Sequence, residues 1–267
     1  IGGVDFLKTG SLVANLNLAP EIHCIQIDGI IGANLMKLAV WKIENEKKRM
    51  FFASSKEKLN IADSDRIVVE FDTKATFTPV VDLTVNDSTT IKRVTFDTGY
   101  GGYLTVNGNY LDPTLTVTEK SYGYSSTGLY GSSFDTVLDV MANMSIAGLN
   151  QNAPVVFSKA KKTNLLGMDF LNQFDVILDW KTNTVELYPI KLKSQNIKSF
   201  GLTPKWLDDK LIVGSVSKGS LAESDGIKVG DVIVKLNRWE FREPHLDTYC
   251  EMMLELHGKK TSVMALE

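Results

Sequence analysis

The sequence predicts a mainly β protein with two related β-rich parts and a smaller C-terminal α+β module. Three observations predict this fold class. Short runs of alternating apolar and polar residues, bounded by turn-forming residues, recur over residues 1–190. Two stretches within those residues resemble each other in the same order. From residue 200 onward the resemblance stops, and the pattern becomes strand, strand, short helix, strand, helix, strand.

The size and charge of the chain exclude several classes of protein. Its 267 residues suffice for about two domains, each with its own core. Hydrophobic residues make up 43% and charged residues 23%, so pervasive disorder is excluded. The 29 basic and 32 acidic residues give a net charge of −3. The chain therefore lacks the excess of positive charge that binds the phosphates of nucleic acids. We therefore expect no nucleic-acid partner.

The internal repeat joins two pairs of segments. Residues 14–19 match 142–147 at an offset of 128, and the longer stretch 29–52 matches 164–188 at an offset of 135. The second copy therefore carries seven more residues in its intervening loops. Each copy continues with an apolar pair plus Gly, a short helix-compatible stretch and a strand-turn-strand unit. In the second copy, residues 179–183 are the predicted hairpin turn.

The second copy is longer at its front end. Its predicted elements are strands at 78–85, 91–97 and 103–106, with a turn at Asn86-Asp87-Ser88. The corresponding part of the first copy would have to precede residue 1.

The predicted domains follow from these patterns. Residues 1–53 are the rear half of a first lobe, and 67–190 are a complete lobe. The polar stretch 54–66 has no apolar period and is the predicted linker between them. A second linker at 191–198 precedes a separate small domain at 199–267.

The C-terminal module has distinct strand and helix signals. Strands are predicted at 210–216 and 231–237. Residues 245–256 place apolar side chains on one face at helical spacing. Trp206 and Trp239 are expected to be packing residues.

Cysteine and histidine are scarce in this chain. Cys24 and Cys250 are far apart, and the three histidines do not have the spacing of a metal site, so we expect no metal. No cofactor is expected either, since water would be the nucleophile in the mechanism considered below. Cys24 lies in an apolar stretch and is expected to be a buried small hydrophobe in a different domain from Cys250. No GxSxG-type elbow surrounds any serine. Any catalytic chemistry is therefore expected from carboxylates.

The sharpest local motif is a β-rich run that ends in Asp97-Thr98-Gly99. Gly99 lets the turn fold tightly, Thr98 can fix the loop through its hydroxyl, and Asp97 projects a carboxylate from a rigid base. The triplet alone is a weak signal, because most such aspartates only cap turns. Its setting adds weight, since Leu165-Leu166-Gly167 lies downstream with a Gly/Tyr/Ser-rich hairpin at 121–131 between the two.

With these segments the sequence resembles the aspartic proteases of the retropepsin and pepsin type, in particular bacterial retropepsin-like proteins with a PDZ domain. The resemblance covers 67–190 as a complete acid-protease-like β-barrel lobe and 1–53 as the rear half of another. It implies that Asp97 is a catalytic aspartate, that Thr98 holds two catalytic loops together and that Gly99 helps to bind substrate.

The resemblance also makes the hairpin at 121–131 a flap over the substrate, with Tyr122, Gly123 and Tyr124 in its substrate-binding part. The alternative is an exposed strand pair with ordinary cross-strand aromatic contacts. One residue departs from the family pattern, because Tyr100 follows the triplet where familiar members usually have Ala or Ser. A bulky side chain there would narrow the cleft or reposition the loop.

The implied mechanism needs two carboxylates that share one proton, since like charges about 3 Å apart cannot both ionise. The equivalent of Asp97 in the first copy would lie 128 residues earlier, upstream of Ile1. Asp169, Asp175 and Asp179 are expected to be surface or turn residues instead. Three alternatives remain open: a partner aspartate upstream, a partner from a second molecule in a homodimer, or a catalytically inactive protein.

Residues 199–267 resemble a PDZ domain. Phe200-Gly201-Leu202 fits the apolar-Gly-apolar loop whose backbone N–H groups capture the C-terminal carboxylate of a peptide. Binding in that family proceeds by strand addition, with the last side chain of the peptide in an apolar pocket beside the helix.

Taken together, the resemblance implies an aspartic endopeptidase that hydrolyses peptide bonds through an Asp-activated water, with a PDZ domain that binds peptide C-termini. The expected partners are a peptide or protein substrate and a peptide C-terminus. One alternative is a non-catalytic peptide-binding protein that uses the lobes as a scaffold, and another is an interaction protein that uses the PDZ domain alone. Because bacterial relatives with this architecture are commonly exported, a periplasmic or cell-surface location is expected.

Overall fold

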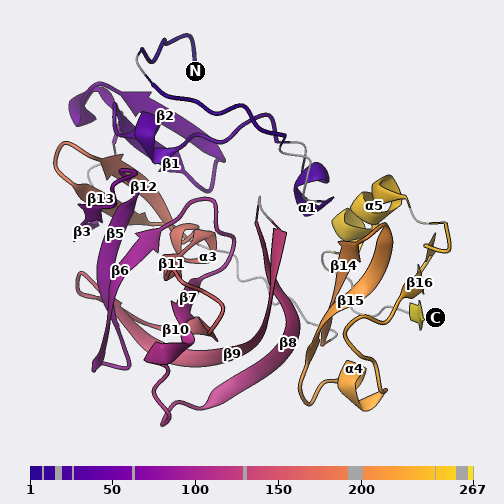
Figure 1. The fold of residues 1–267 in the computed structure, drawn as a ribbon. Coiled ribbons are helices and arrows are strands. Elements are labelled where there is room, and N and C mark those ends of the chain that lie inside the picture. The colour runs from indigo at the N-terminus through magenta and orange to yellow at the C-terminus, as the bar shows by residue number, and fades with distance from the viewer. Residues whose placement is uncertain are drawn as a thin grey trace. The chain divides into compact units, whose positions relative to one another are not determined.

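The computed structural model describes residues 1–7, 9–15, 20–25, 27–61, 64–128, 131–191, 201–243, 245–256 and 264–266 (Figure 1). Strands dominate, so the predicted mainly β class is confirmed. The chain forms two compact units. The first comprises Ile1–Val13, Ile30–Thr116 and Asp139–Lys193, and the second comprises Ala14–Gly29, Val117–Leu138 and Ser194–Glu267.

The first unit contains a five-stranded sheet built from both copies of the repeat. Its strands, in the order β2-β1-β12-β13-β3, are Arg49–Ala53, Val40–Glu44, Phe174–Asp179, Thr184–Pro189 and Ile67–Glu70. The turn between β12 and β13 falls where the sequence predicts it. Its Asn183 adopts a positive φ of 53°, which asparagine tolerates better than most residues.

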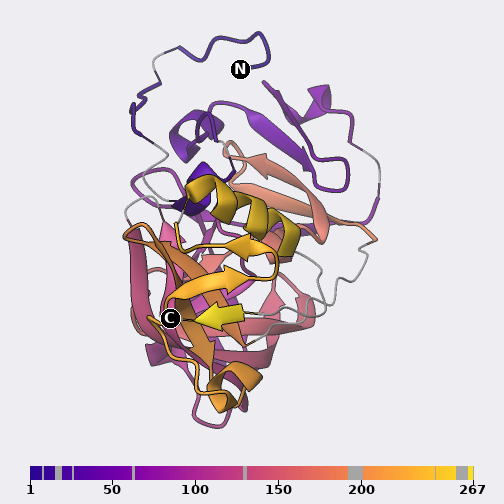
Figure 2. The ribbon, with the colours of Figure 1, turned by 90° about the vertical axis from the view of Figure 1, so that its right-hand side faces the viewer.

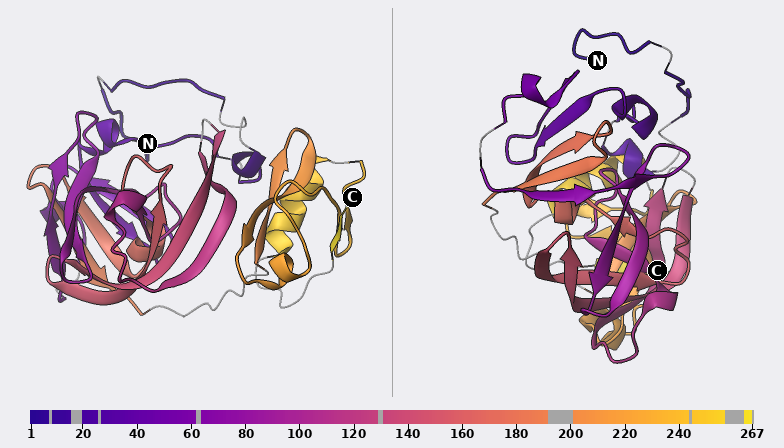
Figure 3. Two further views of the ribbon diagram at one scale, coloured as in Figure 1. Left: turned by 60° about the horizontal axis from the view of Figure 1, so that its bottom comes forward. Right: turned by 90° about the vertical axis from the view of Figure 1, so that its left-hand side faces the viewer.

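The strand register of this sheet has the symmetry of the repeat. Lys42 pairs with Ile177, which is also its repeat equivalent at the offset of 135. On either side, Trp41 pairs with Leu178, which is the repeat equivalent of Ile43. Ile43 in turn pairs with Val176, the repeat equivalent of Trp41. Such reciprocal pairing is the mark of a two-fold relation. β1 and β2 lie beside β12 and β13 in Figure 3 (right).

The short helices after the apolar-Gly segments obey the same relation. Helix α2 (Ala33–Met36) begins after Gly32, and α3 (Met168–Leu171) begins after Gly167. Both have four residues, and they are separated by the same offset of 135. The repeat recognised in the sequence is therefore a repeat of structure.

The linker predicted at 54–66 packs against this sheet. It contains a short 3₁₀ turn, η2 (Lys56–Lys58), and Leu59 is buried against Val40 and Tyr188. Lys56 and Arg66 both form ion pairs with the carboxylate of Glu186. The segment thus contributes side chains to the core of the first unit.

The second sheet of the first unit contains the strands predicted around the Asp-Thr-Gly motif. In the order β10-β7-β11-β6-β5-β4, they are Leu149–Ser158, Leu104–Asn107, Leu165–Leu166, Thr89–Phe96, Pro79–Val85 and Asp72–Thr73. A further turn, η3 (Gly108–Tyr110), follows β7. Asn86 and Asp87 both have φ of 58°, as a tight mirror-image hairpin turn requires. Strand β9 (Gly131–Ile146) runs from the second unit into the first, where Met144 pairs with Val85.

The second unit contains a compact α+β module. Its elements are α1 (Pro20–His23), β8 (Val117–Gly128), β14 (Leu202–Leu207), β15 (Lys210–Ser217), α4 (Leu221–Ser224), β16 (Ile233–Leu236), β17 (Trp239–Glu240), α5 (Leu246–Leu256) and β18 (Met264–Leu266). Figure 2 shows α5 lying across the strands. Trp206 and Trp239 are buried in the core with Tyr249 and Met252 of α5, so both tryptophans pack as predicted.

The structure corrects the expectation for the two cysteines. Cys24 is not a free small hydrophobe, because it forms a disulfide with Cys250 of α5, and both residues belong to the second unit. Cys24 also packs against the apolar core around Trp206. The sequence misses this pairing because 226 residues separate the two cysteines.

Candidate active site

Asp97 stands immediately after strand β6, in the first unit. Its backbone N–H donates to the carbonyl oxygen of Leu166 at 2.9 Å, so the neighbouring strand β11 fixes the point where the loop leaves the sheet. Asp97 is half-buried, whereas Thr98 and Gly99 are exposed. The end of a rigid strand therefore presents a carboxylate with solvent access.

The carboxylate of Asp97 is oriented by its own loop. The N–H of Gly99 donates to Oδ1 of Asp97 at 2.9 Å. A Cβ at position 99 would lie 3.2 Å from this oxygen, a distance that would force a shift. Gly99 therefore allows the tight approach of its amide to the carboxylate.

Gly167 braces the loop from behind. Its N–H donates to the carbonyl oxygen of Tyr103 at 2.9 Å, and the N–H of Met168 donates to that of Tyr100 at 2.7 Å. A Cβ on Gly167 would lie 2.4 Å from the carbonyl oxygens of both Tyr100 and Gly102. No side chain fits at that distance, so the position requires glycine.

Tyr100, the residue after the triplet, folds back against its own loop. Its hydroxyl forms a hydrogen bond with Oγ1 of Thr105. A Cβ on Gly102 would lie 2.2 Å from the Tyr100 hydroxyl oxygen, so the phenol ring covers that glycine. Burial raises the pKa of Tyr100, and the charges of nearby carboxylates, led by Asp169, raise it further. The hydroxyl therefore stays protonated and buttresses the loop.

Asp169, which the sequence predicts to be a surface or turn residue, lies near the loop. It belongs to α3, and its N–H donates to the carbonyl oxygen of Gly102 at 3.3 Å. Partial burial raises its pKa. The available signal was its position two residues after Gly167, since Gly167 contacts the loop directly.

The predicted flap residues lie on strand β8 in the second unit. The rings of Tyr122 and Tyr124 both pack edge-on against Phe134 of β9, with centroid distances of 4.8 and 5.1 Å. Tyr122 is nevertheless 53% exposed, and Gly123 is buried. The hairpin therefore has the cross-strand aromatic contacts of the alternative interpretation, together with an exposed tyrosine.

The predicted carboxylate loop is described in part, because Phe200 lies outside the described residues. Gly201 is buried with a φ of +80°, and its carbonyl oxygen accepts from the N–H of Ser217 at 2.8 Å. A Cβ on Gly201 would lie 2.1 Å from that of Ser220, so only glycine fits. Leu202 begins β14, which is an edge strand among the strands described.

Comparisons with known proteins agree with this description of the C-terminal part. Residues 181–264 match the family described as PDZ domain, so the PDZ domain predicted from the sequence is confirmed. The chain is similar to the EIAV protease complexed with the inhibitor HBY-793, with 18% identity and a TM-score of 0.27 over 35% of this chain and 85% of that one. It is also similar to a retropepsin-like aspartic protease from Rickettsia conorii, with 17% identity and a TM-score of 0.31 over 48% and 94% of the two chains.

Two further features bear on the kind of site. In the described ranges, no group of three or more His, Cys, Asp or Glu side chains is arranged to hold a metal ion. No helix among these residues is long and apolar enough to cross a membrane.

Proposed function

We propose that the protein is an aspartic-type endopeptidase whose PDZ domain binds peptide C-termini. The observation that carries this proposal is the Asp97-Thr98-Gly99 loop, in which the Gly99 amide orients a solvent-accessible carboxylate and Gly167 braces the backbone. Aspartate-based hydrolysis needs such a fixed carboxylate, because a positioned base must hold a water molecule against the substrate carbonyl.

The chemistry requires a second carboxylate facing Asp97. With one proton between them, the ionised group removes a proton from water while the protonated group polarises the peptide carbonyl. The two-fold register around Lys42 and Ile177 supports a partner loop related to the first by the same symmetry. This loop would come from residues preceding Ile1 in the natural chain or from a second molecule in a homodimer.

Exposure of the first copy supports the same proposal. Leu166, which packs beside Asp97, is completely buried. Its repeat equivalent Ile31 is 37% exposed, and the preceding Ile30 is 63% exposed. Exposed apolar side chains such as these are stabilised when another segment covers them and removes them from water. A second Asp-containing loop would bury them as the first loop buries Leu166.

The proposed peptide site of the PDZ domain lies beside β14. This edge strand carries backbone groups that can pair with an added strand. Gly201, at the start of the strand, would supply part of the carboxylate-binding loop together with Phe200 and Leu202. Peptides with a free C-terminus should bind more tightly than their amidated counterparts, and equal affinity would argue against carboxylate capture.

Replacement of the aspartate tests the catalytic proposal. Asp97→Asn in the natural full-length protein should abolish acid-favoured cleavage of a peptide library, because an amide cannot share the proton of the pair. The matched control is Asp87→Asn, a turn position at φ of 58° where asparagine is well tolerated. Unchanged cleavage by the Asp97 variant would remove this residue from the mechanism. Peptide binding without cleavage in the wild type would favour the non-catalytic alternative.

The proposed location is periplasmic or at the cell surface. The Cys24–Cys250 disulfide supports this proposal, because disulfides persist in oxidising compartments and are rare in the reducing cytosol.

A further inference from the structure

The strand that carries the predicted flap residues is also a strand of the PDZ sheet. Ser121, Tyr122 and Gly123 of β8 pair antiparallel with Ser217, Val216 and Ser215 of β15. The pairing continues beyond the ladder, where the N–H of Lys218 donates to the carbonyl oxygen of Lys120 at 2.7 Å and the Ser217 hydroxyl donates to the carboxylate of Glu119. In the second unit, the strands therefore follow the order β14-β15-β8.

Gly123 permits this close pairing of β8 with β15. Gly123 has a φ of +137°, and a Cβ added to it would lie 2.2 Å from the carbonyl oxygen of Gly214. Gly214 sits where the β14–β15 register shifts between Thr203 and Pro204, which marks a bulge. The bulge leaves Gly214 without a pairing partner on β14 and turns its carbonyl toward β8. The close approach of β8 to β15 thus requires glycine at position 123, whereas glycine at position 214 makes room for Lys205 of β14.

A side chain from β14 reaches directly across β15 to β8. Lys205 is only 6% exposed, and a Cβ on Gly214 would lie 2.7 Å from its Cβ, so its stem lies over the glycine. Its Nζ stands 5.5 Å from the ring centroid of Tyr124 on β8, within range of a cation–π interaction. The strand proposed to bind peptides therefore contacts a predicted flap residue through one side chain.

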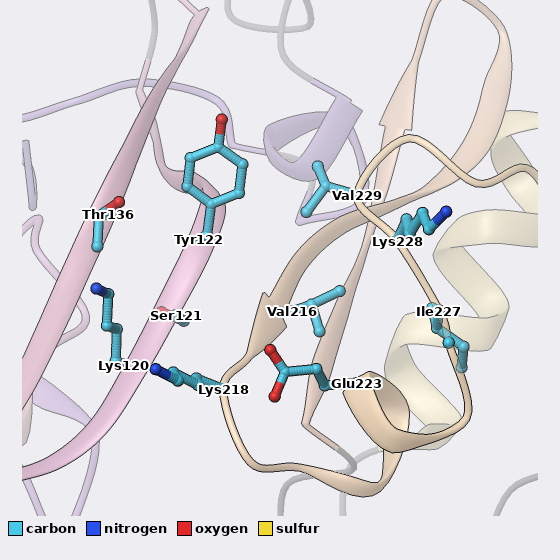
Figure 4. Close-up of a pocket in the computed structure, with 11 residues that line it drawn as sticks. Lys120, Ser121, Tyr122, Thr136, Val216, Lys218, Glu223, Ile227, Lys228 and Val229 are labelled. Atoms are coloured by element: carbon cyan, nitrogen blue, oxygen red, sulfur yellow. The ribbon is translucent and has the colours of Figure 1, made fainter.

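A pocket of about 640 Å³ lies directly against the paired strands, because Ser121 and Tyr122 of β8 and Val216 of β15 are among its lining residues. Figure 4 shows Lys120 and Tyr122 on one wall and Val216, Glu223 and Val229 on the other. The pocket and the 53% exposure of Tyr122 leave this part of the β8–β15 pairing open to solvent. Elements with few buried apolar contacts open at low free energy, so β8 is suited to switch between a paired and an unpaired state.

We propose that the PDZ domain controls the order of the flap, with β8 ordered while it pairs with β15 and released when that pairing is lost. The proposal rests on the flap role within the proposed function. A ligand that adds to the outer edge of β14 stabilises the β14–β15 hairpin, and the hairpin in turn stabilises β8. By thermodynamic reciprocity, a substrate that holds the flap in its paired state tightens ligand binding at the PDZ domain.

Hydrogen exchange of backbone amides tests the pairing without any ligand or activity. Gly123→Ala should speed exchange in residues 117–128 and 210–217 by roughly tenfold or more, because the added Cβ cannot coexist with the Gly214 carbonyl. Gly128→Ala is the matched control on the same strand, since nothing lies within 4 Å of its Cβ. Equal exchange in the two variants would overturn the proposal.

A second variant perturbs the PDZ domain from its far side. Met252→Ala opens a cavity under α5, where Met252 is fully buried, and should loosen β15. Exchange in residues 117–128 should then rise by the same factor as in 210–217. If β8 keeps its protection while β15 loses it, the PDZ domain does not control the flap.

Peptides complete the experiment and separate the two proposals. A random octapeptide pool with free C-termini should slow exchange in β8 of the wild type and the Gly128 variant, but not in the Gly123 variant. Failure of every peptide to bind would contradict the proposed PDZ function, while the two variants would still decide whether β8 follows β15. Binding that protects β14 and leaves β8 unchanged would overturn the coupling alone.

Discussion

The conformation of the loop that carries Asp97 depends on two glycines beside it, which have no side chain. Gly167 and Gly102 bring two backbone segments and the Tyr100 ring into a space that no additional side chain could enter. Tyr100 fills the remaining room and anchors its hydroxyl on Thr105. The rigidity of the loop thus comes from close backbone approach rather than from bulky side chains.

Gly167→Ala should destabilise the protein by about 1–3 kcal/mol, the usual cost of forcing atoms into a packed site. The reason is the 2.4 Å distance from a Cβ at this position to two carbonyl oxygens. Urea unfolding measures the change. Gly101→Ala is the control, because nothing lies within 4 Å of its Cβ, and it should stay within about 0.5 kcal/mol of wild type. Similar losses in both variants would contradict the role given to Gly167.

Glu44 should make the free energy of unfolding of the first unit depend on pH. Hydrogen bonds from Lys42 and then Arg49 lower the pKa of this carboxyl from 4.5 to about 2. Because the folded pKa lies below the unfolded one, the stabilisation is present above pH 4.5 and is lost as the pH falls towards 2. The stability difference between wild type and Glu44→Gln should therefore shrink over that range. The exposed Glu46→Gln variant is the control, and a constant difference for Glu44→Gln would refute the assignment.

At the scale of single residues, the sequence predicted the Asp97-Thr98-Gly99 motif but not all of the side chains that pack around it. The Asp97-Thr98-Gly99 triplet and the Leu-Leu-Gly segment are visible as patterns, and the structure brings Leu166 and Gly167 against the loop. The catalytic and binding roles of these residues remain predictions. The approach of Asp169 was not predictable, because it depends on a contact with Gly102, 67 residues earlier in the chain. The inward fold of Tyr100 uses the nearby residues Gly102 and Thr105, but alternation of apolar and polar residues does not specify the direction of a loop side chain.

At the scale of elements, periodicity predicted the strands well. The strands expected at 78–85 and 91–97 and the helix expected at 245–256 all occur within two residues of their predicted bounds. Alternation marks which residues form a strand, but it does not specify which other strand will pair with it. The pairing of β8 with β15 therefore came only from the structure.

The disulfide joins the segment around α1 to helix α5 and should stabilise the second unit. Removing it by Cys24→Ser should cost about 2–5 kcal/mol, because the unfolded chain loses a cross-link over 226 residues. Denaturant unfolding under oxidising conditions measures the loss. The Cys24→Ser/Cys250→Ser double variant should be no less stable than the single one, and a reductant should destabilise only the wild type. A wild type indifferent to reductant would contradict this prediction.

For the whole molecule, the repeat was the strongest prediction from the sequence. The offset of 135 recurs in the register around Lys42 and Ile177 and in the positions of α2 and α3. A duplicated sequence predicts duplicated packing, and a sheet formed by both copies is one way to bury the apolar faces of each. The division of the chain into units was harder to predict, because β8 and the segment around Cys24 belong to the unit that contains the PDZ domain.

The Cys24–Cys250 link also orders events during biosynthesis. Cys24 leaves the ribosome early, whereas its partner follows 226 residues later, a delay of roughly 10–45 s at about 5–20 residues per second. Throughout that interval the thiol of Cys24 is unpaired, and residues 1–267 contain no third cysteine that could compete for it. Bond formation therefore reports that helix α5 has emerged and can reach the segment around Cys24.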